Sequence, residues 1–170
     1  MRRLILMRHA KSGWDDPDLP DHDRPLSPRG RLAAVLMGAW LADQGLIPDH
    51  ALVSSSLRTV ESWNLLRRGG GFEAPATLAP ALYLAEPEAA LAVLRAAPAD
   101  ADTLLMLGHE PGTTAFLRRL SDGAETAGPR RAYEKFPTGA AAVLDLDAPW
   151  AQAAFGAARF TRFACPKDLV

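Results

Sequence analysis

Two histidines and two arginines in this sequence each stand shortly after a short apolar run. An uncharged imidazole is a competent nucleophile toward phosphorus, and a guanidinium group holds phosphate oxygens with paired N–H donors. If they lie together, such side chains form a pocket suited to a dianionic phosphoryl group. The four residues are Arg8, His9, Arg58 and His109.

The apolar runs before these residues predict three buried strands. Residues 4–7, 51–53 and 103–107 are apolar without alternation, which is typical of central strands covered on both faces. In an open parallel sheet, ligands bind in the crevice beyond the carboxyl ends of the strands. We therefore expect the four side chains to converge there, although they are far apart in the sequence.

Helical periodicities alternate with the extended runs, and this alternation indicates an α/β fold. We predict one domain over residues 1–170, a three-layer sandwich with a mostly parallel central sheet flanked by helices on both faces. Residues 121–137 are polar and contain glycine and proline, so they are predicted to form a long loop. Helices are predicted over residues 28–44, 56–68, 87–97 and 113–120, and further strands near 78 and over 140–146 and 158–163.

Composition narrows the classes of partner. The chain has 170 residues, of which 48% are hydrophobic and 23% charged, and its formal net charge is −1. This balance argues against a broad electrostatic surface for nucleic acid or an anionic membrane. The apolar run at residues 4–7 is too short for a secretory or membrane segment, so we expect a cytoplasmic protein. Cys165 is the single cysteine, which excludes an intramolecular disulfide.

Five segments, in order along the chain, resemble the histidine phosphatase (phosphoglycerate mutase-like) superfamily. Residues 8–15 (RHAKSGWD) resemble the opening R-H-G-x-[S/T]-x-W-N, and residues 26–30 (LSPRG) resemble L-T-x-x-G. Residues 53–62 (VSSSLRTVES) are similar to S-x-x-x-R-x-x-Q-T, and residues 107–112 (LGHEPG) to G-H-N-P-G. Residues 136–140 (FPTGA) match the short bacterial SixA-type phosphohistidine phosphatase branch.

The resemblance implies a phosphoglycerate mutase-like fold and assigns His9 as the nucleophile. It places Arg8, Arg58 and His109 around the phosphate. From the residues alone, the two arginines are also expected to lower the pKa of His9, because they disfavour a second positive charge. Ala10 replaces the usual glycine of the family motif.

Four further positions are candidates for contact with substrate or for proton donation, but common structural roles also explain some of them. The resemblance places the Ser12 hydroxyl near the phosphate, but serine in such a loop is also a common turn former. Asp15 falls where many relatives have asparagine, and Lys11 either contacts substrate or is a solvated rim charge. No acidic residue clearly matches the family's proton donor; Glu86 is nearest in order, although it also suits the first turn of a helix.

The acidic stretch at residues 15–23 does not have the spacing of a metal-binding loop, and two prolines interrupt it. We therefore predict a solvated loop, with His22 at the surface and neither a metal nor an organic cofactor. Arg58, close to a predicted helix start, is unfavourably placed against the helix dipole, so an anion is expected to compensate it.

The expected function is phosphatase activity through a covalent phosphohistidine on His9, most simply on phosphohistidine in a protein. Without a clear acid, a substrate with an N–P bond is favoured, because an imidazole leaves with little proton assistance whereas an alkoxide needs it. One alternative is a broad phosphomonoesterase acting on sugar or nucleotide phosphates. Another, of a different class, is a signalling module that binds phosphoprotein without turnover.

Overall fold

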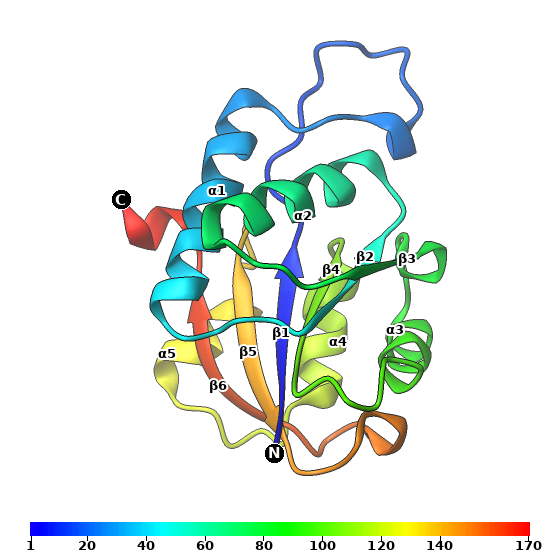
Figure 1. Ribbon diagram of the computed structural model, residues 1–170, viewed down its shortest axis with the longest axis vertical. Coiled ribbons are helices and arrows are strands. Elements are labelled where there is room, and N and C mark those ends of the chain that lie inside the picture. Colours follow the sequence, from blue (N-terminus) through cyan, green and yellow to red (C-terminus); the bar gives the residue numbers. More distant parts are fainter.

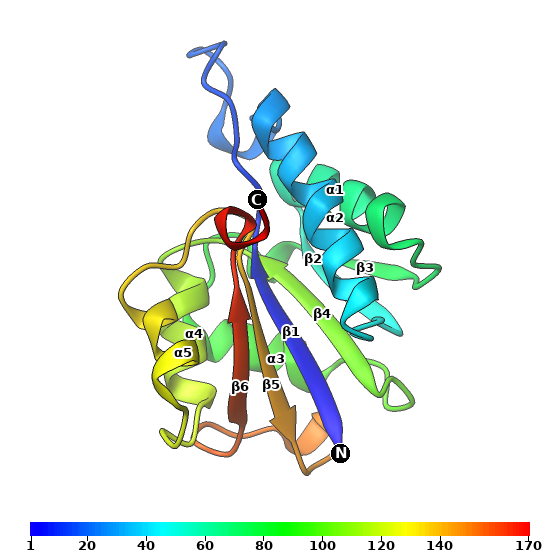
Figure 2. The same cartoon turned by 90° about the vertical axis from the view of Figure 1, so that its left-hand side faces the viewer.

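The protein, described by a computed structural model of residues 1–170, is built on a six-stranded sheet with helices on both faces (Figures 1 and 2). The strands are β1 (Arg2–Arg8), β2 (His50–Ser54), β3 (Ala76–Ala79), β4 (Thr103–Gly108), β5 (Ala141–Leu146) and β6 (Arg159–Ala164). The helices are α1 (Pro28–Asp43), α2 (Leu57–Gly70), α3 (Pro87–Arg95), α4 (Gly112–Leu120) and α5 (Ala127–Arg130).

The strands lie in the order β3-β2-β4-β1-β5-β6. The first four of these are mutually parallel, whereas β5 runs antiparallel to both β1 and β6. The prediction of a mostly parallel sheet between helices is confirmed. The carboxyl ends of β1, β2 and β4 consequently meet at one edge of the sheet, the upper edge in Figure 1.

Each central strand contributes to two cores because successive side chains point to opposite faces. In β1, Leu4 and Leu6 pack in the cluster that includes α3 and α4, while Ile5 and Met7 pack in the cluster that includes α1 and α2. Figure 2 shows these helix pairs on the two sides of the sheet. This double burial explains why the strand sequences are continuously apolar.

The helices that follow β1 and β2 begin where serine predicts an N-cap. The Ser27 hydroxyl accepts a hydrogen bond from Gly30 N at 3.0 Å, and Ser56 caps α2 by accepting one from Thr59 N. Helix α2 ends at Gly71, whose φ of 68° is left-handed. The start of α2 is thus fixed directly beyond the end of β2.

The prediction that residues 121–137 form only a loop is wrong. This segment contains α5 and a 3-10 turn over Arg131–Tyr133, and Pro129 and Ala132 are buried in it. A helix of four residues that includes glycine and proline is too short to produce a helical periodicity. Its position is therefore set by tertiary packing against β6 and not by a sequence pattern.

An arm formed by residues 12–26 projects beyond the carboxyl edge of the sheet (Figures 1 and 2). Its two ends are joined by an antiparallel bridge between Ser12 and Leu26, and its far part contains a 3-10 turn over Asp21–Asp23. No helix in the structure has the length and apolar character needed to cross a membrane.

Candidate active site

The two histidines leave the sheet side by side because β1 and β4 are parallel neighbours. Arg8 pairs with Gly108 in this register, so the next residues, His9 and His109, both follow the strand ends. Their ring centroids are 5.4 Å apart. Both residues are buried, with 7% and 4% exposure, so bulk water has little access to the two rings.

The hydrogen bond of His9 determines which ring nitrogen is free. His9 Nδ1 lies 2.6 Å from the carbonyl oxygen of Ala10, and since that oxygen can only accept, Nδ1 carries the proton. The lone pair is then on Nε2. Burial lowers the pKa of His9 from 6.5 to about 4, with further contributions from Arg58 and Arg8. The ring is therefore uncharged at neutral pH.

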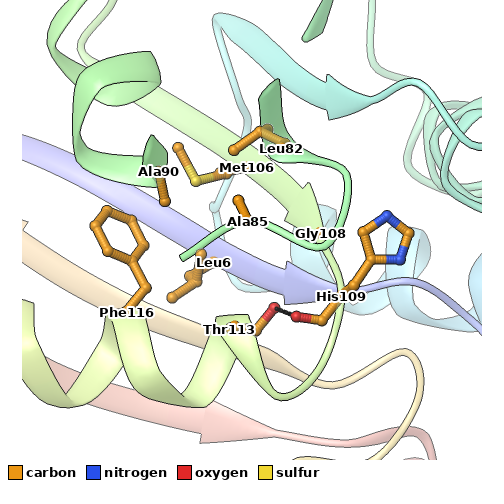
Figure 3. Close-up of a pocket in the computed structure, with 10 residues that line it drawn as sticks. Leu6, Leu82, Ala85, Ala90, Met106, Gly108, His109, Thr113 and Phe116 are labelled. Carbon is orange, nitrogen blue, oxygen red and sulfur yellow. Dashed lines mark hydrogen bonds between the residues drawn. The ribbon is translucent and has the colours of Figure 1, made fainter. Parts of the chain in front are cut away.

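His109 is held at both ring nitrogens. An N–H of Arg58 donates to Nδ1 at 3.3 Å, so Nε2 carries the proton and donates to Ser54 Oγ at 2.8 Å. Burial, together with the nearby His9 and Arg58, lowers the pKa of His109 from 6.5 to about 3. In Figure 3 its ring points away from an apolar pocket of about 20 Å³ beside it, which has room for no more than a water-sized molecule.

The two arginines place positive charge around His9. Arg58 is only 3% exposed, and Arg8 donates from its terminal nitrogen to Phe136 O at 3.1 Å. The Nε–H groups of both arginines are buried without a hydrogen-bond partner in the protein. The structure therefore brings together all four side chains singled out from the sequence.

The prediction that residues 15–23 are simply a solvated loop needs correction, because Asp21 in this segment binds Arg58. Arg58 donates to the Asp21 carbonyl oxygen at 2.7 Å and to its carboxylate at 2.9 Å, and Arg24 donates to the other carboxylate oxygen. Hydrogen bonds from Tyr83, Arg58 and Arg24 hold the pKa of Asp21 well below its usual range. The anion that compensates Arg58 is thus supplied by the arm of the same chain.

Tyr83, Arg24 and His22 were not predicted as parts of the site. Arg24 is buried and donates to Ser12 Oγ at 2.9 Å, which places its charge near enough to His9 to lower that pKa. The Tyr83 ring lies edge-on to both His109 and His22. His22 also contacts Ser55 Oγ at 2.9 Å, and its side chain is 43% exposed, in keeping with the expected surface position. The only sequence signal was one arginine within an acidic stretch.

The remaining candidates lie farther from the histidine pair or make other contacts. Ser12 accepts its bond from Arg24, while Lys11 and Asp15 are exposed. Glu86 is exposed at the N-cap of α3, makes no side-chain capping bond and has no ion pair. These four assignments remain predictions. No three His, Cys, Asp or Glu side chains lie where they could hold a metal ion.

Comparison with known proteins agrees with this architecture. The family model described as the histidine phosphatase superfamily (branch 1) matches residues 4–83. The uncharacterised protein Rv1276c of Mycobacterium tuberculosis is 37% identical over 163 residues, which cover 95% of this chain and 100% of that protein. The match to Rv1276c extends over nearly the whole chain, so the similarity is not confined to one motif.

Two solved structures give the same result. The protein assigned as phosphohistidine phosphatase SixA in Nakamurella multipartitia has a TM-score of 0.83 and 33% identity, covering 97% of this chain and 96% of that one. Its counterpart from Agrobacterium tumefaciens has a TM-score of 0.78 and 26% identity, covering 97% and 98%. The fold is that of the phosphoglycerate mutase-like proteins. The chain belongs to the histidine phosphatase superfamily.

Proposed function

We propose that the protein is a phosphatase that forms a covalent phosphohistidine on His9 Nε2 and acts on phosphohistidine in a protein. The observation that carries this proposal is the pair of partnerless, buried Nε–H groups of Arg8 and Arg58 beside an uncharged imidazole. An unpaired buried donor costs about 1–3 kcal/mol, and the oxygens of a phosphoryl group would satisfy both donors.

In the first step, the lone pair on His9 Nε2 attacks phosphorus in line with the substrate P–N bond. That bond breaks and its electron pair goes to the leaving imidazole nitrogen. A leaving ring whose other nitrogen carries a proton departs as neutral imidazole and needs no acid. The guanidinium groups of Arg8 and Arg58 neutralise the charged phosphoryl oxygens, which is the main contribution a protein makes to such a transfer.

In the second step, water attacks phosphorus and the bond to His9 Nε2 breaks. The electron pair returns to Nε2, inorganic phosphate leaves, and a proton is released to solvent. The hydrogen bond from Nδ1 to Ala10 O keeps the ring in one orientation through both steps. The net reaction consumes one water molecule and regenerates the uncharged imidazole.

Protein phosphohistidine is favoured over a phosphate ester because Asp21, the carboxylate in contact with Arg58, is a poor proton donor. Asp21 is ionised and accepts from Arg58, Arg24 and Tyr83. Both carboxylate oxygens of Glu110 accept hydrogen bonds from Thr114. An alkoxide leaving group would go without acid assistance, which is typically worth about 10²–10⁴-fold. We further propose that the arginine charges make a metal ion unnecessary.

The test is turnover of phosphoramidate, phosphohistidine peptide, sugar phosphates and an aryl phosphate, with and without chelator. We expect the two N–P substrates to be hydrolysed fastest, with no effect of chelator and with acid-labile label on the protein. His9→Asn should lower turnover by at least about 10³-fold and abolish the label. His50→Asn, which removes a histidine outside the site, is the matched control.

Three outcomes would overturn parts of the proposal. Faster hydrolysis of esters than of N–P substrates would indicate a general phosphomonoesterase. Tight phosphoprotein binding that survives His9→Asn, without turnover in the wild type, would indicate a binding module. Loss of activity with chelator would contradict the metal-free mechanism.

A further inference from the structure

An open depression lies between α4 and residues 133–136, and Arg8 of the candidate site is part of its lining. Its volume is about 530 Å³, and Arg8 and Glu110 line it together with Arg118, Tyr133 and Lys135. Arg8 and Glu110 adjoin His9 and His109 in the sequence. We call it the α4 depression. Because Arg8 lines the depression and also acts on His9, a group bound there would be a neighbour of the phosphoryl group that the proposed function places at His9.

The cations on the rim of the α4 depression have no ion-pair partner, whereas the arginines around it do. Arg119, Arg130 and Arg131 are all engaged in ion pairs with carboxylates. Arg118 has no such partner: it donates to the carbonyl oxygen of Tyr133 and stacks on that ring, 4.4 Å from the centroid. Lys135 is exposed and makes no ion pair. Two cations at the rim are therefore free of ion pairs.

We propose that the α4 depression binds an acidic peptide segment adjacent to the phosphohistidine of a protein substrate. The inference rests on the proposed function and specifies the substrate that the site selects. Carboxylates of the segment pair with Arg118 and Lys135 while the phosphoryl group reaches His9. The face of the Arg118 guanidinium stacks on the Tyr133 ring, which leaves N–H groups on its edge to donate to a carboxylate.

The distance along α4 from its start to Arg118 sets where the acidic residues of the bound peptide must lie. Arg118 is six residues beyond the start of α4, which corresponds to roughly 9 Å at about 1.5 Å per residue. An extended peptide covers that length in about three residues. The acidic positions are accordingly two to four residues from the phosphohistidine.

Two carboxylates also line the α4 depression and reduce its positive charge. Glu110 is held in place by its two hydrogen bonds from Thr114, close to Arg8. Glu134 is exposed and makes no ion pair. With Arg8, Arg118 and Lys135 the lining still has an excess of positive charge, and Glu134→Gln should strengthen the preference for acidic segments.

The experiment compares kcat/KM for phosphohistidine peptides that differ only two to four residues from the phosphohistidine, with aspartate, serine or lysine on either side. At low salt we expect the aspartate peptide to exceed the lysine peptide by roughly 3- to 10-fold on at least one side, as for exposed charge pairs. The difference should disappear at about 0.5–1 M salt. Arg118→Glu with Lys135→Glu should reverse the order.

The matched control is Arg67→Glu with Arg68→Glu, which changes net charge equally at exposed positions of α2 and should keep the wild-type order. Each result is a ratio within one variant, so a loss of folded protein does not distort it. Equal rates on all peptides, or an order unchanged in the α4 variant, would overturn the inference. Phosphoramidate has no flanking residues. If the wild-type protein does not hydrolyse phosphoramidate, that result would contradict the proposed function and not the peptide preference.

Discussion

Arg58 is held in place by contacts from two different parts of the chain. It reaches Asp21 in the arm through both the backbone carbonyl and the carboxylate, and it reaches His109 after β4. The Arg58 side chain is only 4% exposed, so it has little room to move and these contacts fix the position of its guanidinium group. Asp21 thereby fixes a cation of the proposed phosphate pocket.

Asp21→Asn should consequently impair both stability and turnover. The neutral amide cannot accept from Arg58 and Arg24 together, and Asp21 is half exposed, so we expect a loss of about 1–2 kcal/mol in the free energy of unfolding. Misplacement of Arg58 should lower kcat on phosphoramidate roughly 10- to 100-fold. Tyr83→Phe, which removes one hydroxyl from the same carboxylate, should change kcat little. Equal kcat for Asp21→Asn and wild type would show that Arg58 is positioned without Asp21.

The positions of the four candidate-site residues could be predicted from sequence because each lies at the end of a strand, or shortly after it, and the strand register is fixed. A buried strand can only end at the sheet edge, so residues just beyond it gather there. Asp21, Arg24 and Tyr83 could not be predicted in the same way. They lie outside any strand, and their meeting depends on the path of the arm, which no periodicity encodes.

Helices α1 and α2 approach each other at glycines on both sides. A Cβ added at Gly38 would lie 2.2 Å from Leu66 O, and one added at Gly69 would lie 2.1 Å from Val35 O. Both obstacles are backbone atoms, which cannot move without displacing a helix. The absence of side chains at these positions lets the pair cover the sheet closely.

Gly38→Ala should therefore lower the free energy of unfolding by about 1–3 kcal/mol, the usual cost of overpacking. Gly128→Ala in α5 is the control, because a Cβ there meets nothing within 4 Å. Alanine is the better helix former, so the control should be neutral or slightly stabilising. Urea unfolding of both variants against wild type measures the difference. A Gly38→Ala protein as stable as wild type would mean that the helices can separate at no cost.

At the scale of the whole molecule, two buried imidazoles make folding sensitive to pH. Burial lowers the pKa of His9 to about 4 and that of His109 to about 3, whereas unfolded histidine has a pKa near 6.5. Between these values the unfolded chain binds more protons than the folded one. Stability is therefore full above pH 6.5 and falls as pH decreases toward 4. The lowered carboxylate pKa values of Asp21 and Asp168 act in a separate window, below pH 4.

We expect the free energy of unfolding to fall between pH 7 and pH 5, by up to roughly 2 kcal/mol for each ring. His9→Asn with His109→Asn should remove most of this slope, because neither replacement titrates. His50→Asn removes a ring outside the site and should leave most of the slope intact. Urea unfolding at several pH values, in buffers free of phosphate, measures it. A wild-type stability that does not change between pH 7 and 5 would require both rings to titrate as exposed histidines, which contradicts their burial beside Arg8 and Arg58.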